Sequence, residues 1–308
     1  MTSAIETQGL TRYFRRQAAV DGITMQVPAG GVFALIGPNG AGKTTFIKLL
    51  MGLIRPTRGS ARVLGRDSRR LDPSTFARIG YVSESQRLPD WMTTDELLRN
   101  VRPFYPTWDD ALCRRLQRDL GLTDRKRLGA LSRGTRMKAA LLASLAYQPE
   151  LIVLDEPFTG LDPLVRDELI AALLELPGAH PWTVLVSSHD IEEVERLADW
   201  IGFIDRGRLL FAEPVAALLA RFRLVEVVSE NGAAFAAPTL PAWVPQGTAG
   251  RTLRFVDTQH AAPDAAERIQ AAYAGADIRM TPLSLREIFV TLAREASASS
   301  RSDVMEAS

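Results

Sequence analysis

The sequence has few of the features that mark secreted, membrane-spanning or nucleic-acid-binding proteins. Among its 308 residues there is one cysteine, Cys113, which excludes a disulfide within the chain and favours a reducing compartment. No apolar run approaches the roughly 20 residues that cross a bilayer, and the opening residues, MTSAIETQGL, lack the basic and then apolar pattern of a signal peptide. The formal net charge is only +1, so we expect no nucleic acid among its partners. These absences predict a soluble, cytoplasmic chain, for which any membrane role comes through a partner.

The chain does contain enough apolar sequence for a large buried core. Apolar residues make up 46% of it and charged residues 24%, as in ordinary globular proteins. Its length suits one large domain and a smaller one. We expect the larger domain over residues 1–220, with a helical insertion at about 86–148, and a small α/β accessory domain over 221–295. Residues 296–308 are rich in Ser and Ala and are expected to be disordered.

Strand-like and helix-like patterns alternate along the larger domain, which predicts an α/β fold with a mainly parallel sheet. The Pro-Ala-Gly-Gly segment at 28–31 lies between two strand-like runs and predicts a hairpin. In the accessory domain we expect strands at 224–228, 252–256 and 277–280, and helices at 264–274 and 285–292.

A glycine-rich loop carries the strongest chemical signal. Residues 37 to 44 read GPNGAGKT and lie between the strand-like run Val32–Ile36 and an apolar helix pattern. This is the setting of a P-loop, whose backbone N–H groups and following helix hold a polyphosphate. Lys43 is placed to reach the β- and γ-phosphates, and the Thr44 hydroxyl to ligate Mg²⁺. The alternative, an accidental match in a glycine-rich turn, is disfavoured by the segments that follow. The residues predicted to bind ATP here are Gly37, Pro38, Asn39, Gly40, Ala41, Gly42, Lys43, Thr44 and Thr45.

Two further segments suit a nucleotide site. Asp155 and Glu156 follow the apolar run at 151–154. An Asp at the end of a buried strand beside a P-loop can hold Mg²⁺, and the next Glu can orient the attacking water. The alternative is a pair of carboxylates at an exposed strand end. Upstream, Ser132 is a natural N-cap, so Ser132 and the Gly134 N–H form either a second anion-binding helix terminus or an ordinary capped helix.

Taken in order, these segments resemble the motifs of the ATP-binding subunit of an ATP-binding cassette (ABC) transporter. The resemblance covers residues 4 to about 215 and implies a P-loop NTPase cassette, with antiparallel N-terminal strands beside the mainly parallel sheet. The matching motifs are Walker A (Gly37–Thr45), the signature (Leu131–Thr135), Walker B (Leu151–Glu156), the D-loop (Gly160–Asp162) and the switch histidine, His189.

The resemblance also implies roles for individual residues. His189 would contact the γ-phosphate, although a lone His at a strand end can be structural. Asp162 would couple two active sites across a dimer and can also cap the helix that follows it. An aromatic residue before the P-loop would stack on adenine, and Phe14 has that place, with Tyr13 as the alternative, unless the side chain packs in the core. The catalytic residues that the resemblance implies are Glu156, His189 and Lys43.

The chain departs from the family's common pattern at two places. Arg133 and Thr135 stand where the signature usually has Gly and Gln. Glu84 stands where a Gln usually follows the strand, while Gln86 comes two residues later. Either Glu84 or Gln86 can contribute to the metal site, and Gln86 can equally be a solvated loop residue.

One chain supplies one P-loop and one signature helix, and in the family these two elements face away from each other. The resemblance therefore implies that two copies, or this chain and a paired ABC subunit, close head to tail around two ATP molecules. Integral-membrane permease subunits would use that cycle for transport, and they would hold the chain on the inner face of the cell membrane.

The segment 81–108 would lie near the permease, with Leu88, Trp91 and Met92 either filling a groove on it or packing locally. This segment and residues 284–289 resemble exporter-type subunits, which favours export over import. The alternatives are a soluble, non-transport ABC ATPase and a nucleotide-dependent regulatory module.

Overall fold

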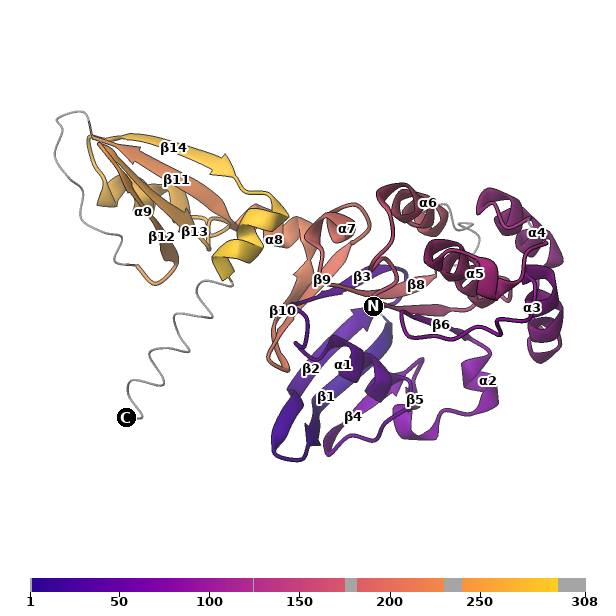
Figure 1. The fold of residues 1–308 in the computed structure, drawn as a ribbon. Helices are drawn as coiled ribbons and strands as arrows, with labels where there is room; N and C mark the ends of the chain where they lie inside the picture. The colour runs from indigo at the N-terminus through magenta and orange to yellow at the C-terminus, as the bar shows by residue number, and fades with distance from the viewer. Residues whose placement is uncertain (1, 124, 175–181, 230–239, 293–308) are drawn as a thin grey trace. The chain divides into compact units, whose positions relative to one another are not determined.

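The computed structural model describes residues 2–123, 125–174, 182–229 and 240–292, and the chain divides into two compact units (Figure 1). The first unit is Met1–Glu213 and the second is Pro214–Ser308. The tail expected at 296–308 lies outside the described residues.

The first unit is built on a six-stranded sheet with the order β10-β9-β3-β8-β7-β6. The pairs β9-β3, β3-β8, β8-β7 and β7-β6 are parallel, so the predicted mainly parallel sheet is confirmed. Every residue of β7 and β8 is buried, which explains their continuous apolar sequences. The strands are β3 (Gly31–Ile36), β6 (Ile79–Ser83), β7 (Leu151–Asp155), β8 (Thr183–Ser188), β9 (Trp200–Asp205) and β10 (Arg208–Pro214).

A second, antiparallel sheet has the order β2-β1-β4-β5, and it corrects the predicted hairpin at 28–31. The two strands flanking that turn do not pair, because β2 pairs with β1 while β3 pairs with β8 and β9. The turn instead carries the chain from one sheet to the other, and Gly30 and Gly31 both have positive φ there. The strands are β1 (Ser3–Phe14), β2 (Gln17–Pro28), β4 (Arg58–Val63) and β5 (Arg66–Asp67).

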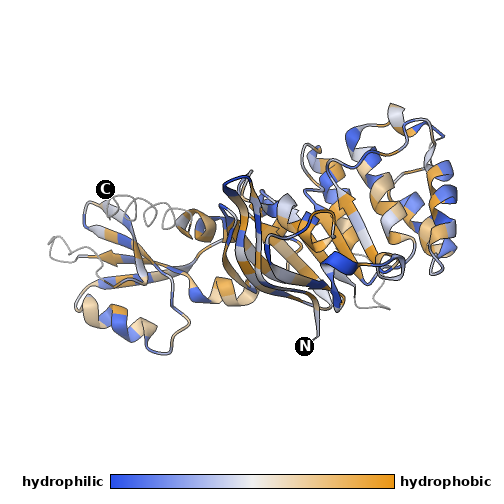
Figure 2. Cartoon of the chain, turned by 90° about the horizontal axis from the view of Figure 1, so that it is seen from below, coloured by the Kyte–Doolittle hydropathy of each residue, from blue (hydrophilic) through white to orange (hydrophobic). Residues whose placement is uncertain are grey.

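The hydrophobic core of this unit fixes the helix that follows the P-loop, α1 (Lys43–Leu50). Phe46, Ile47, Leu49 and Leu50 are fully buried and join residues of both sheets in one cluster. Burying such side chains contributes roughly 1.5–3 kcal/mol each relative to exposure. Figure 2 shows the strands of the central sheet as mostly hydrophobic, whereas the helices carry both hydrophobic and hydrophilic residues. The start of α1 is therefore held rigidly against the carboxyl end of β3.

The predicted helical insertion is present between β6 and β7, which are adjacent in the sheet. Its first long helix begins at a capping box, in which Thr93 Oγ1 accepts from the Glu96 N–H and the Glu96 carboxylate accepts from the Thr93 N–H. The Tyr147 hydroxyl donates to Ile79 O at 2.8 Å and ties the insertion to β6. The insertion's one cysteine, Cys113, is buried, and burial raises the pKa of its thiol to about 11. The helices of this unit after α1 are α2 (Pro73–Phe76), α3 (Thr94–Val101), α4 (Asp110–Asp119), α5 (Arg133–Leu145), α6 (Pro163–Leu174) and α7 (Ile191–Glu195).

The second unit has its own antiparallel sheet, in the order β12-β13-β11-β14, and its own core, where the rings of Trp243, Phe255 and Tyr273 lie 5.0–6.0 Å apart. Strand β12 was not predicted from the sequence, because Pro245 and Gly247 interrupt its pattern and the pairing shifts register between them. In the part of the chain that the structure describes, no helix is both long and apolar enough to span a bilayer. The elements are α8 (Val215–Arg221), β11 (Arg223–Val228), β12 (Trp243–Ala249), β13 (Thr252–Asp257), α9 (Ala265–Ala272), β14 (Asp277–Pro282) and helical residues at 285–292.

Candidate nucleotide and catalytic site

The carboxyl ends of the parallel strands bring four motifs to one edge of the sheet. The P-loop follows β3, Glu84 follows β6, Glu156 follows β7 and His189 follows β8. The register aligns these ends, since Ser83 lies beside Asp155 and Asp155 beside Ser187. Parallel strands thus collect residues that are more than a hundred positions apart in the sequence.

Backbone crowding explains two of the P-loop glycines. A Cβ on Gly42 would lie 2.2 Å from Ala19 O, and the residue has φ 107°. A Cβ on Gly37 would lie 2.1 Å from Ile204 O. Gly42 is also the N-cap of α1 and offers no side-chain cap, so the first N–H groups of α1 are left for a ligand.

The P-loop borders a cavity of about 400 Å³. A cavity of this size with backbone N–H groups and a lysine on its wall suits the phosphates of a nucleotide. Its lining residues are Ala19, Asn39, Gly40, Ala41, Gly42, Lys43, Thr44, Thr45, Glu84, Glu156 and Thr159.

The Lys43 side chain is buried and lies among oxygen atoms. Its Nζ is 2.6 Å from Gly37 O, 3.2 Å from Pro38 O and 3.0 Å from Glu156 Oε1. Lys43 therefore holds the glycine loop in shape and forms an ion pair with the predicted catalytic carboxylate.

Asp155 is buried at the end of β7 and is held by two hydroxyl groups. Thr44 Oγ1 donates to Asp155 Oδ1 at 3.0 Å, and Ser187 Oγ donates to the same oxygen at 2.9 Å. Burial raises the pKa of Asp155, although these hydrogen bonds oppose the rise. A hydroxyl and a desolvated carboxylate side by side are oxygen ligands that suit Mg²⁺, whose charge would compensate the buried carboxylate.

Glu156 has the most contacts of the predicted catalytic residues. Its Oε2 accepts from Thr159 Oγ1 at 2.9 Å and lies 2.8 Å from His189 Nδ1. Its backbone N–H donates to Ser187 Oγ, and its φ is 53°, a strained value for a residue other than glycine. Burial alone would raise its pKa, but the hydrogen bonds from His189 and Lys43 and the charge of Lys43 hold the pKa below its ordinary value. The carboxylate is thus ionised and fixed at the edge of the cavity.

The alternatives Glu84 and Gln86 border one cavity together and differ in the second cavity that each borders. The Glu84 side chain borders the P-loop cavity, and its N–H donates to Asp155 O at 3.0 Å. Both residues border the cavity of about 740 Å³ beside α5, and Gln86 borders a third cavity but not the P-loop cavity. The geometry therefore favours Glu84 over Gln86 as the residue near the metal site.

The signature residues do not border the P-loop cavity in the described part of the chain. Ser132 is the N-cap of α5, and its Oγ accepts from the Thr135 N–H at 3.1 Å. Gly134 packs against α6, where an added Cβ would lie 2.7 Å from Val165 Cγ1. Asp162 caps α6 by accepting from the Val165 N–H at 3.1 Å. Helix capping by Ser132 and Asp162 and helix packing at Gly134 thus explain these residue types structurally, independently of any role in nucleotide binding.

Phe14 is the last residue of β1, and its side chain is 47% exposed. It therefore does not pack in the core, which was the alternative interpretation of this residue. The Arg12 guanidinium lies over its ring, 4.7 Å from the centroid. Tyr13, the runner-up, is 37% exposed and pairs with Ala18, next to the cavity residue Ala19. Both rings remain candidates for contact with a base.

Three residues around the site were not assigned from the sequence. Ser187 holds both Asp155 and Glu156, and Thr159 fixes the Glu156 carboxylate. Arg133 forms an ion pair with Glu84. The only available signal was position, since Ser187 directly precedes the Ser188-His189 pair and Thr159 directly precedes the D-loop.

Comparisons with known proteins identify the family of the chain. The sequence profile described as "ABC transporter" matches residues 20–159. The daunorubicin/doxorubicin resistance ATP-binding protein DrrA of Streptomyces peucetius is 37% identical over 68% of this chain, and the match spans 64% of that relative. The lantibiotic transport ATP-binding protein SrtF of Streptococcus pyogenes is 33% identical over 67% of this chain and 89% of its own length. A solved structure titled "Structure of ATP binding subunit of ABC transporter" has 28% identity and a TM-score of 0.63, covering 70% of this chain and 92% of that one.

Proposed function

The chain belongs to the ABC transporter family, whose ATP-binding subunits are ATPases, and from that premise we propose that it powers export through a separate permease. The observation that carries the proposal is the Glu156 carboxylate, held at the edge of the P-loop cavity by Lys43, Thr159 and His189. Two similar proteins are named for drug resistance and lantibiotic transport, which supports export over import.

In the proposed reaction, the P-loop amides and Lys43 bind the β- and γ-phosphates, which requires Lys43 to exchange Glu156 for phosphate oxygen. Glu156, freed from Lys43 and still held by Thr159 and His189, accepts a hydrogen bond from the attacking water and orients it. His189, whose side chain is 37% exposed, keeps Nδ1 beside Glu156 and can present Nε2 to the γ-phosphate. Mg²⁺ held by Thr44 and Asp155 would neutralise phosphate charge.

The site of one chain lacks charge stabilisation on the far side of the γ-phosphate. No signature residue borders the P-loop cavity in the described residues, whereas phosphoryl transfer needs stabilisation on both sides. We therefore propose that two subunits close head to tail, with Ser132 of one facing the P-loop of the other.

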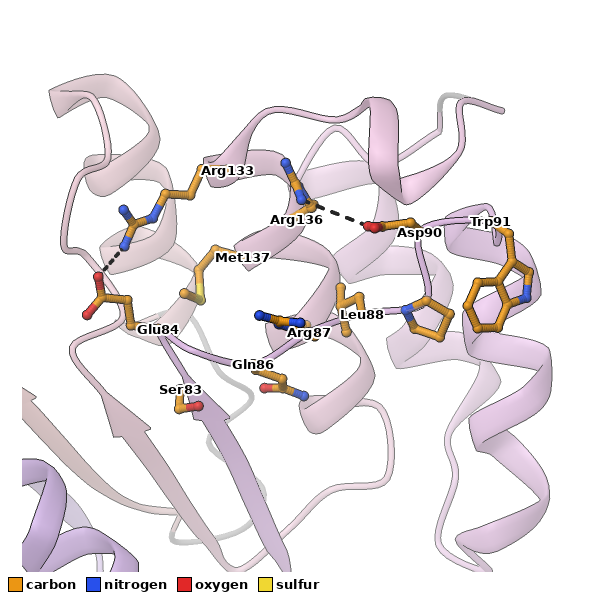
Figure 3. A pocket seen from close by; sticks show the side chains of 12 residues that line it. Ser83, Glu84, Gln86, Arg87, Leu88, Asp90, Trp91, Arg133, Arg136 and Met137 are labelled. Carbon is orange, nitrogen blue, oxygen red and sulfur yellow. Dashed lines mark hydrogen bonds and ion pairs between the residues drawn. The ribbon is translucent and has the colours of Figure 1, made fainter.

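The proposed permease contact is an open cavity of about 740 Å³ between the loop after β6 and helix α5 (Figure 3). Trp91 is 68% exposed at one end of it, while Leu88 and Met92 are only partly exposed. Exposed aromatic surface of this kind suits a partner helix. This contact would place the subunit on the cytoplasmic face of the membrane.

Replacing Glu156 tests the proposal directly. Glu156→Gln should retain ATP binding and lower turnover by roughly 10²–10⁴-fold, the usual loss when a positioned acid–base group is removed. Phosphate release by the purified protein measures turnover, and titration with a fluorescent ATP analogue measures binding.

A control variant separates binding from chemistry. Lys43→Ala should weaken the binding itself, because the buried ammonium is the side chain placed to reach the phosphates. Near-normal turnover by Glu156→Gln would exclude Glu156 from the catalytic role.

A further inference from the structure

Two positions at which the chain departs from the family's common pattern face each other. Arg133 Nη2 donates to Glu84 Oε1 at 2.6 Å (Figure 3). We propose that Arg133 is a positioning residue, which holds and neutralises the Glu84 carboxylate beside the nucleotide cavity, so that the two unusual residues work as one unit. The inference rests on the ATPase function proposed above and identifies an additional residue that acts on its site.

The Glu84 carboxylate needs such a partner because of where it lies. Glu84 borders the same cavity as Lys43 and Thr44 and also the neighbouring cavity that Arg133 lines, and its backbone N–H donates to Asp155 O at the end of β7. A neutral glutamine there would add no charge, whereas a free carboxylate would repel a polyphosphate at close range. A cation paired with Glu84 removes most of that repulsion.

Arg133 is held in position to supply that cation. It is the first residue of α5, directly after the N-cap Ser132, and the positive end of this helix also favours a nearby carboxylate. Its guanidinium passes over the turn that follows β7, where a Cβ on Gly160 would lie 2.8 Å from Nη1. The absence of a side chain on Gly160 leaves room for the half-exposed Arg133 side chain to reach Glu84.

The pair contributes little to stability, because both side chains are about half exposed, 48% for Arg133 and 43% for Glu84. A pair of similar exposure elsewhere in the same unit, joined by two hydrogen bonds rather than one, provides a control. Arg78 Nε donates to Glu150 Oε1 at 2.6 Å, and these side chains are 44% and 54% exposed. If such ion pairs affected only the stability of the fold, breaking either pair would have the same effect on nucleotide affinity.

The test is a double-mutant cycle on the full chain. Arg133→Ala should raise the half-saturating concentration of Mg·ATP by roughly threefold to tenfold, the effect of one uncompensated charge near the phosphates. Adding Glu84→Gln to Arg133→Ala should restore the value to within about twofold of wild type, because the repelling charge is gone. Arg133→Lys should retain most of the affinity, and the loss in Arg133→Ala should shrink in high salt, which screens the repulsion. The control variants Arg78→Ala and Arg78→Ala/Glu150→Gln should leave nucleotide affinity unchanged.

The outcomes separate this inference from the proposed function. Rescue by Glu84→Gln, with melting temperatures near that of wild type, supports the positioning role. Independent, multiplying effects of Arg133→Ala and Glu84→Gln, or equal losses in the Arg78 control, overturn it. Failure of the ATPase proposal would show instead as absent turnover in wild type or normal turnover in Glu156→Gln, and the affinity cycle can be read in either case.

Discussion

At the scale of single residues, Asp155 shows a conflict between folding and function. The fold buries its carboxylate, and desolvation raises the pKa above the ordinary value of 3.8. In the unfolded chain the group ionises at its ordinary pKa, so ionisation favours unfolding as the pH rises from about 4 through the raised pKa. Near neutral pH, the ionised Asp155 therefore destabilises the protein until a cation binds.

This conflict predicts the behaviour of Asp155→Asn. The variant should lose Mg²⁺-dependent ATPase activity yet melt higher than wild type without nucleotide, by about 2–4 °C if relief is near 1 kcal/mol. The gain should be full at neutral pH and should shrink as the pH falls through the raised pKa of Asp155, because the folded wild-type carboxylate then becomes protonated.

Scanning calorimetry across this pH range measures the gain. Asp119→Asn, on the exposed side of α4, is the control and should show no such trend. A variant less stable than wild type at pH 7 would contradict the account.

A site residue can be predicted from the sequence when the constraint on it comes from neighbouring residues, and not when it comes from residues distant in the sequence. Gly42 is favoured by its own backbone angle, φ 107°, which is a local constraint, so the loop could be identified by its motif. The pairing of Lys43 with Glu156 joins the first residue of α1 to the residue that follows β7, and no pattern in the sequence specifies it. The same holds for Ser187, whose hydroxyl reaches Asp155 only because β7 and β8 are aligned.

At the scale of elements, the packing of α5 on α6 depends on Gly134. A side chain there would press on Val165, since the added Cβ would lie 2.7 Å from Val165 Cγ1. Overpacking typically costs about 1–3 kcal/mol, more than the roughly 1 kcal/mol that Ala gains over Gly in a helix.

We therefore expect Gly134→Ala to lower the free energy of unfolding by about 1 kcal/mol. Combining it with Val165→Ala should show a favourable coupling above about 0.5 kcal/mol, because the smaller side chain makes room. Urea unfolding of the four proteins measures both values. If stability is recovered but ATPase activity is not, Gly134 has a second role at the nucleotide; strictly additive losses would argue against the steric explanation.

The elements also show where sequence patterns mislead. The Pro-Ala-Gly-Gly turn correctly marks a change of direction, but it does not specify which strand comes to lie beside β3. The apolar sequence of β3 suits a strand covered on both faces, and that tertiary preference decides its pairing. Strand β12 was missed for a different reason, because Pro245 and Gly247 interrupt the strand pattern although the segment pairs with β13.

At the scale of the whole molecule, the order of motifs predicted the fold class, because the P-loop, Glu156 and His189 each follow a strand of one mainly parallel sheet. The association of subunits is a separate question. The proposal that two subunits associate rests on the absence of Ser132 from the described lining of the P-loop cavity.

The head-to-tail proposal predicts a change of mass. Glu156→Gln should double its mass at saturating Mg·ATP, because ATP that is not hydrolysed keeps two subunits closed. Light scattering coupled to size-exclusion chromatography measures this.

Adding Ser132→Arg should keep the protein monomeric while leaving its binding of fluorescent nucleotide unchanged. A Glu156→Gln protein that stays monomeric even alongside its permease would end the proposal.

The buried thiol of Cys113 has a practical consequence. It is 7% exposed, and its pKa of about 11 leaves almost no thiolate at neutral pH. Because it is also the chain's one cysteine, maleimide dyes will find little to modify in the native protein. Reporter cysteines can therefore be introduced at chosen surface positions and labelled specifically, without first replacing Cys113.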